Sequence, residues 1–324
     1  MTPSEIITKP ISGEMKNFEA YFRNSMKSPV PLLDIILNYL IRRKGKQMRP
    51  MIVFLSAKLN GGINNTTFVA ASLIELLHTA TLVHDDVVDE TNERRGFFSI
   101  RALWKSKIAV LVGDYLLSKG LLLAIDNNET ELLRIVSVAV REMSEGELLQ
   151  IEKSRKLNIS EPEYFEIIRK KTATLIASCA ASGAKSAGAA VHIIEIMRLF
   201  GEYTGIAFQI KDDIFDYQKK GLIGKPTGND IKEKKITLPL IYALENATDK
   251  ERKRILKLIS ARQKDQGKID EIIDFVNVKK GLEYAASKMD NYRQKAIEML
   301  DQFENCEAKN SLIELVNYTT TRNM

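Results

Sequence analysis

Apolar residues recur along most of the chain at the three- and four-residue spacing that places side chains on one face of an α-helix. Long intervals without proline are rich in Ala, Leu, Glu, Lys and Ile, which helices accept readily. Alternating strand patterns bounded by turn residues are nearly absent. The pattern predicts helices over residues 13–27, 31–43, 50–59, 65–90, 106–126, 129–155, 161–169, 171–188, 190–218, 237–246, 249–262, 267–276, 278–304 and 307–321.

Turn residues separate these predicted helices. A Gly-Gly pair at positions 61 and 62 precedes a long helix, and residues 221–230 contain three Gly and one Pro. No linker is long or polar enough to mark a domain boundary. The sequence therefore predicts an all-α fold in which residues 1–324 form one large helical bundle.

The composition limits the possible partners. The chain has 324 residues, of which 44% are hydrophobic, so it can bury a sizeable core. Its net charge is +6, which fits an anionic ligand or transient contact with acidic lipid. The basic residues are dispersed and form no stripe with aromatic residues, so we expect no nucleic-acid binding.

The cysteines and the apolar runs bear on localisation. There are only two cysteines and no CxxC pair. We therefore expect no disulfide framework, and we expect the protein to work in a reducing compartment. The N-terminal segment has no apolar run like that of a signal peptide. No stretch of 18 uncharged apolar residues is present. We expect a soluble cytoplasmic protein.

An acidic pattern occurs twice, each time at the end of a long apolar helix. The two copies are His84-Asp85-Asp86-Val87-Val88-Asp89 and Lys211-Asp212-Asp213-Ile214-Phe215-Asp216. Carboxylates four residues apart share one helical face, and they are unfavourable at a helix C-terminus, where the dipole is negative. A single copy is more often a solvated helix end. The repetition favours a site for Mg²⁺, which prefers carboxylate oxygens and often bridges phosphates.

Basic residues follow each acidic cluster and also lie in one earlier loop. Arg binds phosphate oxygens through a planar fork, and Lys offers a compact charge. Taken singly, each is more often a surface charge. Together with the acids they indicate a diphosphate held by metal, with a second anion site nearby. These residues are Lys46, Arg49, Arg94, Arg95, Lys171, Lys225 and Lys235.

The order and spacing of these motifs resemble those of the trans-isoprenyl (polyprenyl) diphosphate synthase family over nearly the whole chain, and most closely its long-chain members. The matching segments are residues 45–50, 78–89, 94–96, 112–115, 171–172, 208–216, 224–228 and 237–240. The resemblance implies a helical bundle of the isoprenoid synthase type with a central substrate cavity.

The resemblance also implies a role for each site residue. Asp85, Asp89 and Asp212 would bind Mg²⁺, supported by Asp86, Asp213 and Asp216. The diphosphate of the allylic substrate would be neutralised by Arg94, Lys171, Lys225 and Lys235. The diphosphate of isopentenyl diphosphate would be held by Lys46, Arg49, His78 and Arg95. Thr172 and Gln209 would line the reacting region.

Two positions depart from the family pattern. The usual Gly-Gly-Lys of the first basic loop is Lys44-Gly45-Lys46 in this chain. A Gly common before the last lysine is replaced by Lys234, which leaves both Lys234 and Lys235 as candidates for that role. Neither departure removes a charge that the implied chemistry needs.

The implied reaction is the repeated head-to-tail addition of isopentenyl diphosphate to an allylic diphosphate. Loss of the allylic diphosphate gives a cation, the isopentenyl double bond attacks it, and a proton is then lost. The resemblance also implies a homodimer and leaves room for peripheral membrane contact when the product is released. It does not identify the preferred primer.

Small residues precede the first acidic cluster where related short-chain enzymes carry an aromatic side chain. The positions that would set product length are Leu77, Ala80 and Thr81. The distance from Ile74 to Asp85, roughly 16 Å, holds only about three or four isoprene units, whereas the resemblance favours about six to nine. A short-chain farnesyl or geranylgeranyl product remains the alternative, as does a purely packing role for these residues.

Three other classes of protein fit the sequence less well. A metal-dependent phosphohydrolase would need more than the three histidines present. A class I terpene cyclase would not need the second anion site formed by Lys46, Arg49 and Arg95. A non-catalytic partner subunit or apolar carrier would be free to lose the six aspartates, and all six are present. Catalysis is therefore favoured.

Overall fold

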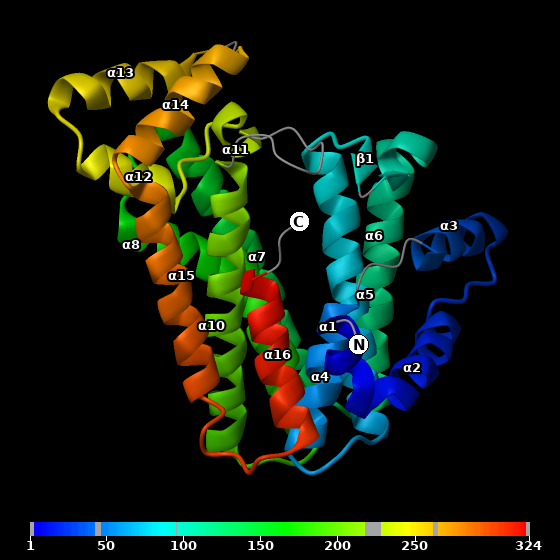
Figure 1. The fold of residues 1–324 in the computed structure, drawn as a ribbon. Helices are drawn as coiled ribbons and strands as arrows, with labels where there is room; N and C mark the ends of the chain where they lie inside the picture. The colour runs from blue at the N-terminus through cyan, green and yellow to red at the C-terminus, as the bar shows by residue number, and fades with distance from the viewer. Residues whose placement is uncertain (1–2, 43–46, 95, 218–227, 262–264, 322–324) are drawn as a thin grey trace. The chain divides into compact units, whose positions relative to one another are not determined.

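The computed structural model describes residues 3–42, 47–94, 96–217, 228–261 and 265–321, and helices make up most of this part (Figure 1). The chain divides into two compact units. Unit 1 consists of Met1–Val140, Ser178–Arg198 and Phe303–Glu314, and unit 2 consists of Arg141–Ala177, Leu199–Gln302 and Leu315–Met324. The single domain expected from the sequence stays a prediction.

Unit 1 begins with a series of helices and contains a short hairpin. Its elements are α1 (Pro3–Thr8), the 3₁₀ helix η1 (Lys9–Ile11), α2 (Ser12–Ser25), α3 (Pro31–Arg42), α4 (Met48–Leu59), α5 (Asn65–Val88), β1 (Glu93–Arg94), β2 (Phe97–Phe98) and α6 (Ile100–Asp126). The two strands pair in antiparallel fashion, with Arg94 opposite Phe97.

Unit 2 holds the helices that follow. These are α8 (Glu161–Ile168), the π-helix η2 (Arg169–Ala173), α11 (Asn229–Lys232), α12 (Leu238–Glu245), α13 (Asp249–Ser260), α14 (Gln266–Val278) and α15 (Gly281–Glu298). Four helices have residues in both units, namely α7 (Thr130–Lys156), α9 (Thr174–Ser186), α10 (Val191–Asp216) and α16 (Glu307–Thr321).

Helices α5 and α6 of unit 1 pack side by side in opposite directions (Figure 1). A Cβ atom on Gly113 of α6 would lie 2.2 Å from Nε2 of His84, and one on Gly120 would lie 3.2 Å from Leu77. Glycine at these two positions therefore lets α6 approach the helix that carries the first acidic cluster.

A similar close approach fixes α10 against η2 and α9 in unit 2. A Cβ atom on Gly201 would lie 2.6 Å from the carbonyl oxygen of Ile176, and one on Gly205 would lie 2.5 Å from Cα of Ala173. Because these neighbours are backbone atoms, side-chain movement cannot relieve such a clash. The many Ala, Ser and Gly residues of segment 172–190 suit this close packing.

The predicted helices match the structure well, with local exceptions. Helix α6 begins at Ile100, but Lys105 has φ 69° and ψ 163°, so the regular helix after this kink starts where the sequence predicts it, at residue 106. The hairpin, α1 and α11 are too short to give a periodic signal and were not predicted. The last long helix of unit 2 ends at Glu298 rather than at residue 304.

Among the residues that the structure describes, two helices are long and apolar enough to cross a membrane by length and composition, α5 and α6. Of the most apolar 18 residues, 61% are buried in α5 and 33% in α6. Helix α5 is therefore mainly a core helix. Helix α6 leaves five large apolar side chains exposed, namely Leu103, Val110, Leu111, Leu122 and Ile125. We call these five residues the α6 face.

Candidate active site

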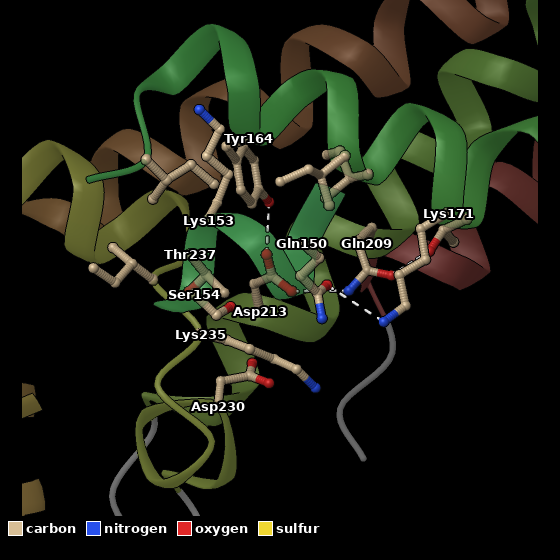
Figure 2. Close-up of a pocket in the computed structure, with 15 residues that line it drawn as sticks. Gln150, Lys153, Ser154, Tyr164, Lys171, Gln209, Asp213, Asp230, Lys235 and Thr237 are labelled. Carbon is tan, nitrogen blue, oxygen red and sulfur yellow. Dashed lines mark hydrogen bonds between the residues drawn. The ribbon is translucent and has the colours of Figure 1, made fainter. Parts of the chain in front are cut away.

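The second acidic cluster lies at the C-terminal end of α10, and Asp213 is its buried member. The hydroxyl of Tyr164, on α8, donates to Oδ2 of Asp213 at 2.6 Å. The side-chain amide of Gln209, one turn earlier on α10, donates to Oδ1 at 2.9 Å. Figure 2 shows the carboxylate between these two donors. Both oxygens of a carboxylate that is only 4% exposed therefore have hydrogen-bond donors.

Gln209 extends this network to the π-helix η2. Oγ1 of Thr172 donates to Oε1 of Gln209 at 2.8 Å. Next to it in the sequence, Nζ of Lys171 donates to Oε1 of Gln150 on α7 at 3.3 Å. The two residues that the sequence placed in the reacting region, Thr172 and Gln209, thus contact each other and are linked through Gln209 to Asp213.

The π-helix contains a wide turn, because the N–H of Thr174 bonds to the carbonyl of Arg169 five residues earlier. Such turns often occur at functional sites. Helix α7 comes close to this turn at Gly146, where a Cβ atom would lie 2.8 Å from the backbone nitrogen of Lys171. The glycine therefore permits the contact that brings Lys171 beside Gln150.

Three successive basic residues of η2 pair with acids of α7. Arg169 contacts Glu142 at 3.0 Å, Lys170 contacts Glu145 at 3.0 Å, and Lys171 contacts Glu147. All of these side chains are partly exposed, so each pair contributes little to stability by itself. Together they fix the register of the π-helix along α7, and they leave the Lys171 ammonium at the edge of the cavity.

Asp216 anchors the chain that returns after residues 218–227. Its Oδ1 and Oδ2 accept the backbone N–H groups of Asn229 and Asp230 at 2.9 and 3.0 Å, and its carbonyl accepts the N–H of Gly228 at 3.0 Å. The side chain predicted as a supporting metal ligand therefore also holds α11 against the end of α10.

A cavity of about 110 Å³ lies beside this network (Figure 2). It is lined by Gln150, Lys153, Ser154, Ile159, Tyr164, Ile167, Ile168, Lys171, Thr172, Gln209, Asp213, Asp230, Lys235, Ile236 and Thr237. Lys235 lines the cavity, whereas Lys234 does not and has a φ of 61°. A positive φ favours glycine, which gives a physical reason for the Gly common at this position in related sequences.

Burial raises the pKa values of the acids around this cavity. It raises that of Asp213 from 3.8 to about 7, although the hydrogen bond from Tyr164 acts in the opposite direction. Burial and the charge of Asp216 raise the pKa of Asp230 to about 6. Burial also raises the pKa of Asp216. Three acids that resist ionisation, two at the end of α10 and one in α11, favour a nearby cation.

Lys235, one of the lysines that line the cavity, has a raised pKa despite its burial. Burial by itself would lower the pKa of Lys235, but the hydrogen bond to Glu233 and the negative charges of Glu233 and Asp230 outweigh this effect and raise it. Lys235 therefore stays cationic at neutral pH and can attract an anion into the cavity.

The first acidic cluster occupies the corresponding end of α5 in unit 1. Asp85 and Asp89 are exposed, and Asp86 is buried. The backbone N–H of Asp89 bonds to the carbonyl of Asp85 at 2.8 Å, so the helix continues up to Asp89. The two exposed carboxylates therefore lie on one face of the helix, as their spacing predicts.

Arg49 and His78 of the predicted second anion site also belong to unit 1. The Nε and Nη2 atoms of Arg49 lie 3.3 and 3.1 Å from Oε2 of Glu75, so one edge of the guanidinium is held by a carboxylate. Glu75 and His78 are partly exposed residues of α5. A guanidinium bound along one edge keeps its Nη1 end as a further donor.

The residues predicted to set product length lie on α5. Ala80 is 2% exposed and packs in a core cluster with Val83, Leu116 and their neighbours, and Leu77 covers Gly120. Thr81 is partly exposed, and its hydroxyl donates to the carbonyl of His78. Ala80 and Leu77 thus have packing roles, which makes Thr81 the position where a larger side chain is best tolerated.

Several predicted residues lie outside the described residues: Lys46, Arg95 and Lys225. Arg94 belongs to β1. The cavity residues that were not predicted as site residues include Gln150, Tyr164 and Asp230. Asp230 could have been found as a carboxylate just beyond the Gly-rich loop. Tyr164 and Gln150 gave no sequence signal, because they reach the site only through helix packing.

The donors available in these regions fit a hard divalent cation. Within the described ranges, no three His, Cys, Asp or Glu side chains form a group that could hold a metal ion by itself. Mg²⁺ does not need such a group, because it keeps several waters and is usually bound by one or two carboxylates together with substrate phosphates. In unit 2, Asp212 would offer oxygen ligands of this kind, with Asp213 in support.

A model of the family described as Polyprenyl synthetase matches residues 30–276. The chain belongs to the polyprenyl synthetase family. It is therefore a prenyltransferase of the polyprenyl diphosphate synthase type, and the resemblance found in the motifs is confirmed. The heptaprenyl diphosphate synthase component 2 of Bacillus subtilis is 33% identical over 314 residues, which are 96% of this chain and 89% of that protein.

Solved structures of family members confirm the all-α fold. A polyprenyl synthase from Caulobacter crescentus, complexed with calcium and isoprenyl diphosphate, is 32% identical with a TM-score of 0.89, and the match covers 98% of each chain. A geranylgeranyl pyrophosphate synthase from Bacteroides thetaiotaomicron is 38% identical with a TM-score of 0.84, over 99% of this chain and 100% of that one. Further relatives at 31–33% identity include octaprenyl, nonaprenyl and short-chain synthases of this family.

The raised pKa of Asp213 predicts a pH-dependent stability without metal. An acid whose pKa is higher in the folded than in the unfolded state stabilises the fold below pH 3.8, and this contribution is lost as the pH rises towards about 7. In Asp213→Asn the loss cannot occur. We therefore compare the melting temperatures of the variant and the unaltered protein by thermal unfolding in the presence of a chelator. The melting temperature of the variant minus that of the unaltered protein should increase by several degrees between pH 5 and pH 8. A difference that is constant with pH would contradict this.

Proposed function

We propose that this chain condenses isopentenyl diphosphate head-to-tail with an allylic diphosphate to form an all-trans polyprenyl diphosphate. The observation that carries the proposal is the cavity in which the buried carboxylate of Asp213 lies near Lys171 and Lys235. Acids and ammonium groups of this kind suit a metal-bound diphosphate better than an apolar ligand. Family membership supports the same substrates, since the Caulobacter crescentus relative was solved with isoprenyl diphosphate.

The proposed metal is Mg²⁺. Its ligands would come from the two acidic clusters, with Asp85, Asp89 and Asp212 as ligands and Asp86, Asp213 and Asp216 in support. The calcium in the Caulobacter crescentus relative supports a divalent ion with oxygen ligands. When bound, the ion supplies positive charge that stabilises the departing diphosphate.

The basic residues of the site would then act on the allylic substrate. Lys171 and Lys235, with Lys225 and Arg94, neutralise the charge that grows on the diphosphate as its bond to the allylic carbon breaks. The double bond of isopentenyl diphosphate forms the new carbon–carbon bond to that carbon, and a proton leaves the adjacent carbon. The products are the lengthened diphosphate, inorganic diphosphate and one proton, so the equation balances.

A second set of residues would hold isopentenyl diphosphate. We propose Arg49, His78, Lys46 and Arg95 for this role. Glu75 binds one edge of the Arg49 guanidinium, so the remaining edge can donate to phosphate oxygens. Thr172 and Gln209 would line the space in which the two carbons meet.

Incubation of the purified protein with Mg²⁺, isopentenyl diphosphate and farnesyl diphosphate tests this proposal. Mass analysis should give a prenyl diphosphate longer than the primer, with one inorganic diphosphate released for each unit added. Diphosphate or phosphate release without isopentenyl diphosphate would instead favour a hydrolase or a cyclase, and the absence of any turnover would favour a carrier.

Removing one carboxylate from either cluster tests the metal assignment. We expect Asp85→Ala and Asp212→Ala to lose at least 100-fold in kcat/KM, because each removes a ligand that stabilises the departing diphosphate. Steady-state rates at rising Mg²⁺ concentrations measure the effect. The exposed Asp290 of α15 provides a control, since Asp290→Ala should leave the rate unchanged. Rates close to those of the unaltered protein at saturating Mg²⁺ would contradict the assignment.

We propose a long product of about six to nine isoprene units on the basis of the long-chain relatives, although the roughly 16 Å from Ile74 to Asp85 holds only about three or four units. The small side chains before the first acidic cluster support a long product, because no aromatic residue blocks the first turn. The geranylgeranyl pyrophosphate synthase relative, at 38% identity, supports the shorter alternative. Product length is therefore the property to measure directly.

Thr81→Phe tests the product-length assignment. A bulky ring at this partly exposed position should shorten the main product and preserve turnover, whereas Ala80→Phe should destabilise the buried core cluster. Thr79→Phe is the matched control. The hydroxyl of Thr79 donates to the carbonyl of Glu75, as the hydroxyl of Thr81 donates to the carbonyl of His78. Thr79, however, lies on a different side of α5 from Thr81. Chromatography of dephosphorylated products measures length, and an unchanged length in Thr81→Phe would contradict the assignment.

We propose that the α6 face is covered by a second copy of this chain, giving a cytoplasmic homodimer. Five large apolar side chains are exposed on one helix, which is unusual for a monomer. The same helix exposes Asp114, a charged residue that would be costly in the middle of a membrane. Transient contact with a membrane during product release is compatible with this proposal.

Leu111→Glu tests the dimer. A carboxylate in the α6 face should dissociate the dimer, because it would lose its hydration in an apolar interface. Light scattering should give twice the chain mass for the unaltered protein and a single chain mass for the variant. Val278→Glu is the control, since Val278 is also an exposed apolar residue but belongs to α14. A monomeric unaltered protein would contradict the proposal, and a requirement for a different subunit would appear as activity restored only by that partner.

A further inference from the structure

Tyr164 is a buried residue of α8, and its hydroxyl donates a hydrogen bond to Asp213. Its side chain is 3% exposed, and its ring contacts Phe165 and the apolar core of unit 2. A phenylalanine would fill the same apolar space. A buried hydroxyl costs free energy unless it is hydrogen-bonded, so the hydroxyl at this position is explained by its acceptor rather than by packing.

The acceptor is a carboxylate that needs orientation. The last torsion of an aspartate side chain is broad, so an exposed carboxylate rotates easily. At Asp213, Tyr164 holds one oxygen at 2.6 Å and Gln209 holds the other at 2.9 Å. Two donors from different helices fix the plane of the carboxylate. The lone pairs that these donors do not use then have defined directions.

Gln209 is itself held in place. Its Oε1 accepts from Thr172 at 2.8 Å, which fixes the amide so that its nitrogen is the group that donates to Asp213. Four side chains from α8, η2 and α10 thus form one connected chain of hydrogen bonds (Figure 2). Tyr164 ends this chain, and it is the member whose side chain lies in the apolar core.

We propose that Tyr164 is a positioning residue that orients Asp213 for binding of the metal–diphosphate complex. The proposal rests on the function proposed above and adds a residue outside both acidic clusters. Replacing a residue that orients a metal-binding carboxylate through a hydrogen bond commonly lowers the metal affinity by 10–100-fold. Tyr164 therefore acts through Asp213 on the metal and the allylic diphosphate rather than on isopentenyl diphosphate.

The test uses Tyr164→Phe in the full-length protein, with Mg²⁺ and inorganic diphosphate as the probe. The Mg²⁺ concentration that gives half of the maximal thermal stabilisation in the presence of diphosphate should rise about tenfold or more. In steady-state assays, the Mg²⁺ requirement and the KM for the allylic substrate should rise, and the KM for isopentenyl diphosphate should not change. A purely structural role would lower the melting temperature without changing the Mg²⁺ requirement.

Tyr284→Phe is the matched control. Like that of Tyr164, the hydroxyl of Tyr284 donates to a carboxylate, Oε2 of Glu161 at 2.7 Å. Glu161 lies in α8 and belongs to neither acidic cluster. We expect this variant to keep the Mg²⁺ dependence of the unaltered protein. An equal shift in Tyr284→Phe and Tyr164→Phe would overturn the proposal, and so would an unchanged Mg²⁺ requirement in Tyr164→Phe.

A double variant tests whether Tyr164 acts through Asp213. Replacement of two groups in one pathway is non-additive. Adding Tyr164→Phe to Asp213→Asn should therefore change the Mg²⁺ requirement by less than twofold, and a further tenfold loss would overturn the proposal. This comparison also applies if Tyr164→Phe alone does not fold.

If the unaltered protein forms prenyl product but the variants show no such pattern, only the role of Tyr164 fails. If the unaltered protein neither forms product nor binds diphosphate with Mg²⁺, both proposals fail.

Discussion

Negative charge buried at the C-terminal end of a helix is the constraint around which the site of unit 2 is built. The helix dipole and the loss of hydration both oppose an ionised Asp213. The surrounding residues compensate locally: Tyr164 and Gln209 donate to the carboxylate, Asp216 bonds to the backbone of α11, and Lys235 supplies positive charge beside the cavity. This compensation is incomplete in the ligand-free protein, since the pKa of Asp213 remains about 7.

The remaining imbalance connects stability with function. A carboxyl group that holds its proton near neutral pH must release it when a divalent ion binds, so metal binding and proton release are coupled. A site arranged for a cation is therefore less stable when the cation is absent, a general cost of pre-organised binding sites. In this protein the cost falls on a few residues at the end of α10, and the apolar cluster beneath them is well packed.

The sequence predicted the parts of the structure that depend on local spacing. The long helices were found because proline-free apolar periodicity extends over many turns, and Asp85 and Asp89 were placed on one face by a spacing of four. The wide turn of η2 was not found, because one additional residue in a helix leaves no mark in composition. Tyr164 was missed for a different reason: its partner is 49 residues away in the sequence, and only packing brings the two together.

The wide turn has a geometric consequence for the chain that contains it. In an uninterrupted α-helix, Tyr164 and Thr172 would be separated by about 80° around the axis, whereas one extra residue within a turn reduces this angle to about 20°. The side chains of Tyr164 and Thr172 can then line the same cavity from one continuous helical segment. Shortening of this segment by a single residue would leave each helix intact and yet rotate one half of the network away from the other, so insertions and deletions are tolerated far less here than in a surface loop.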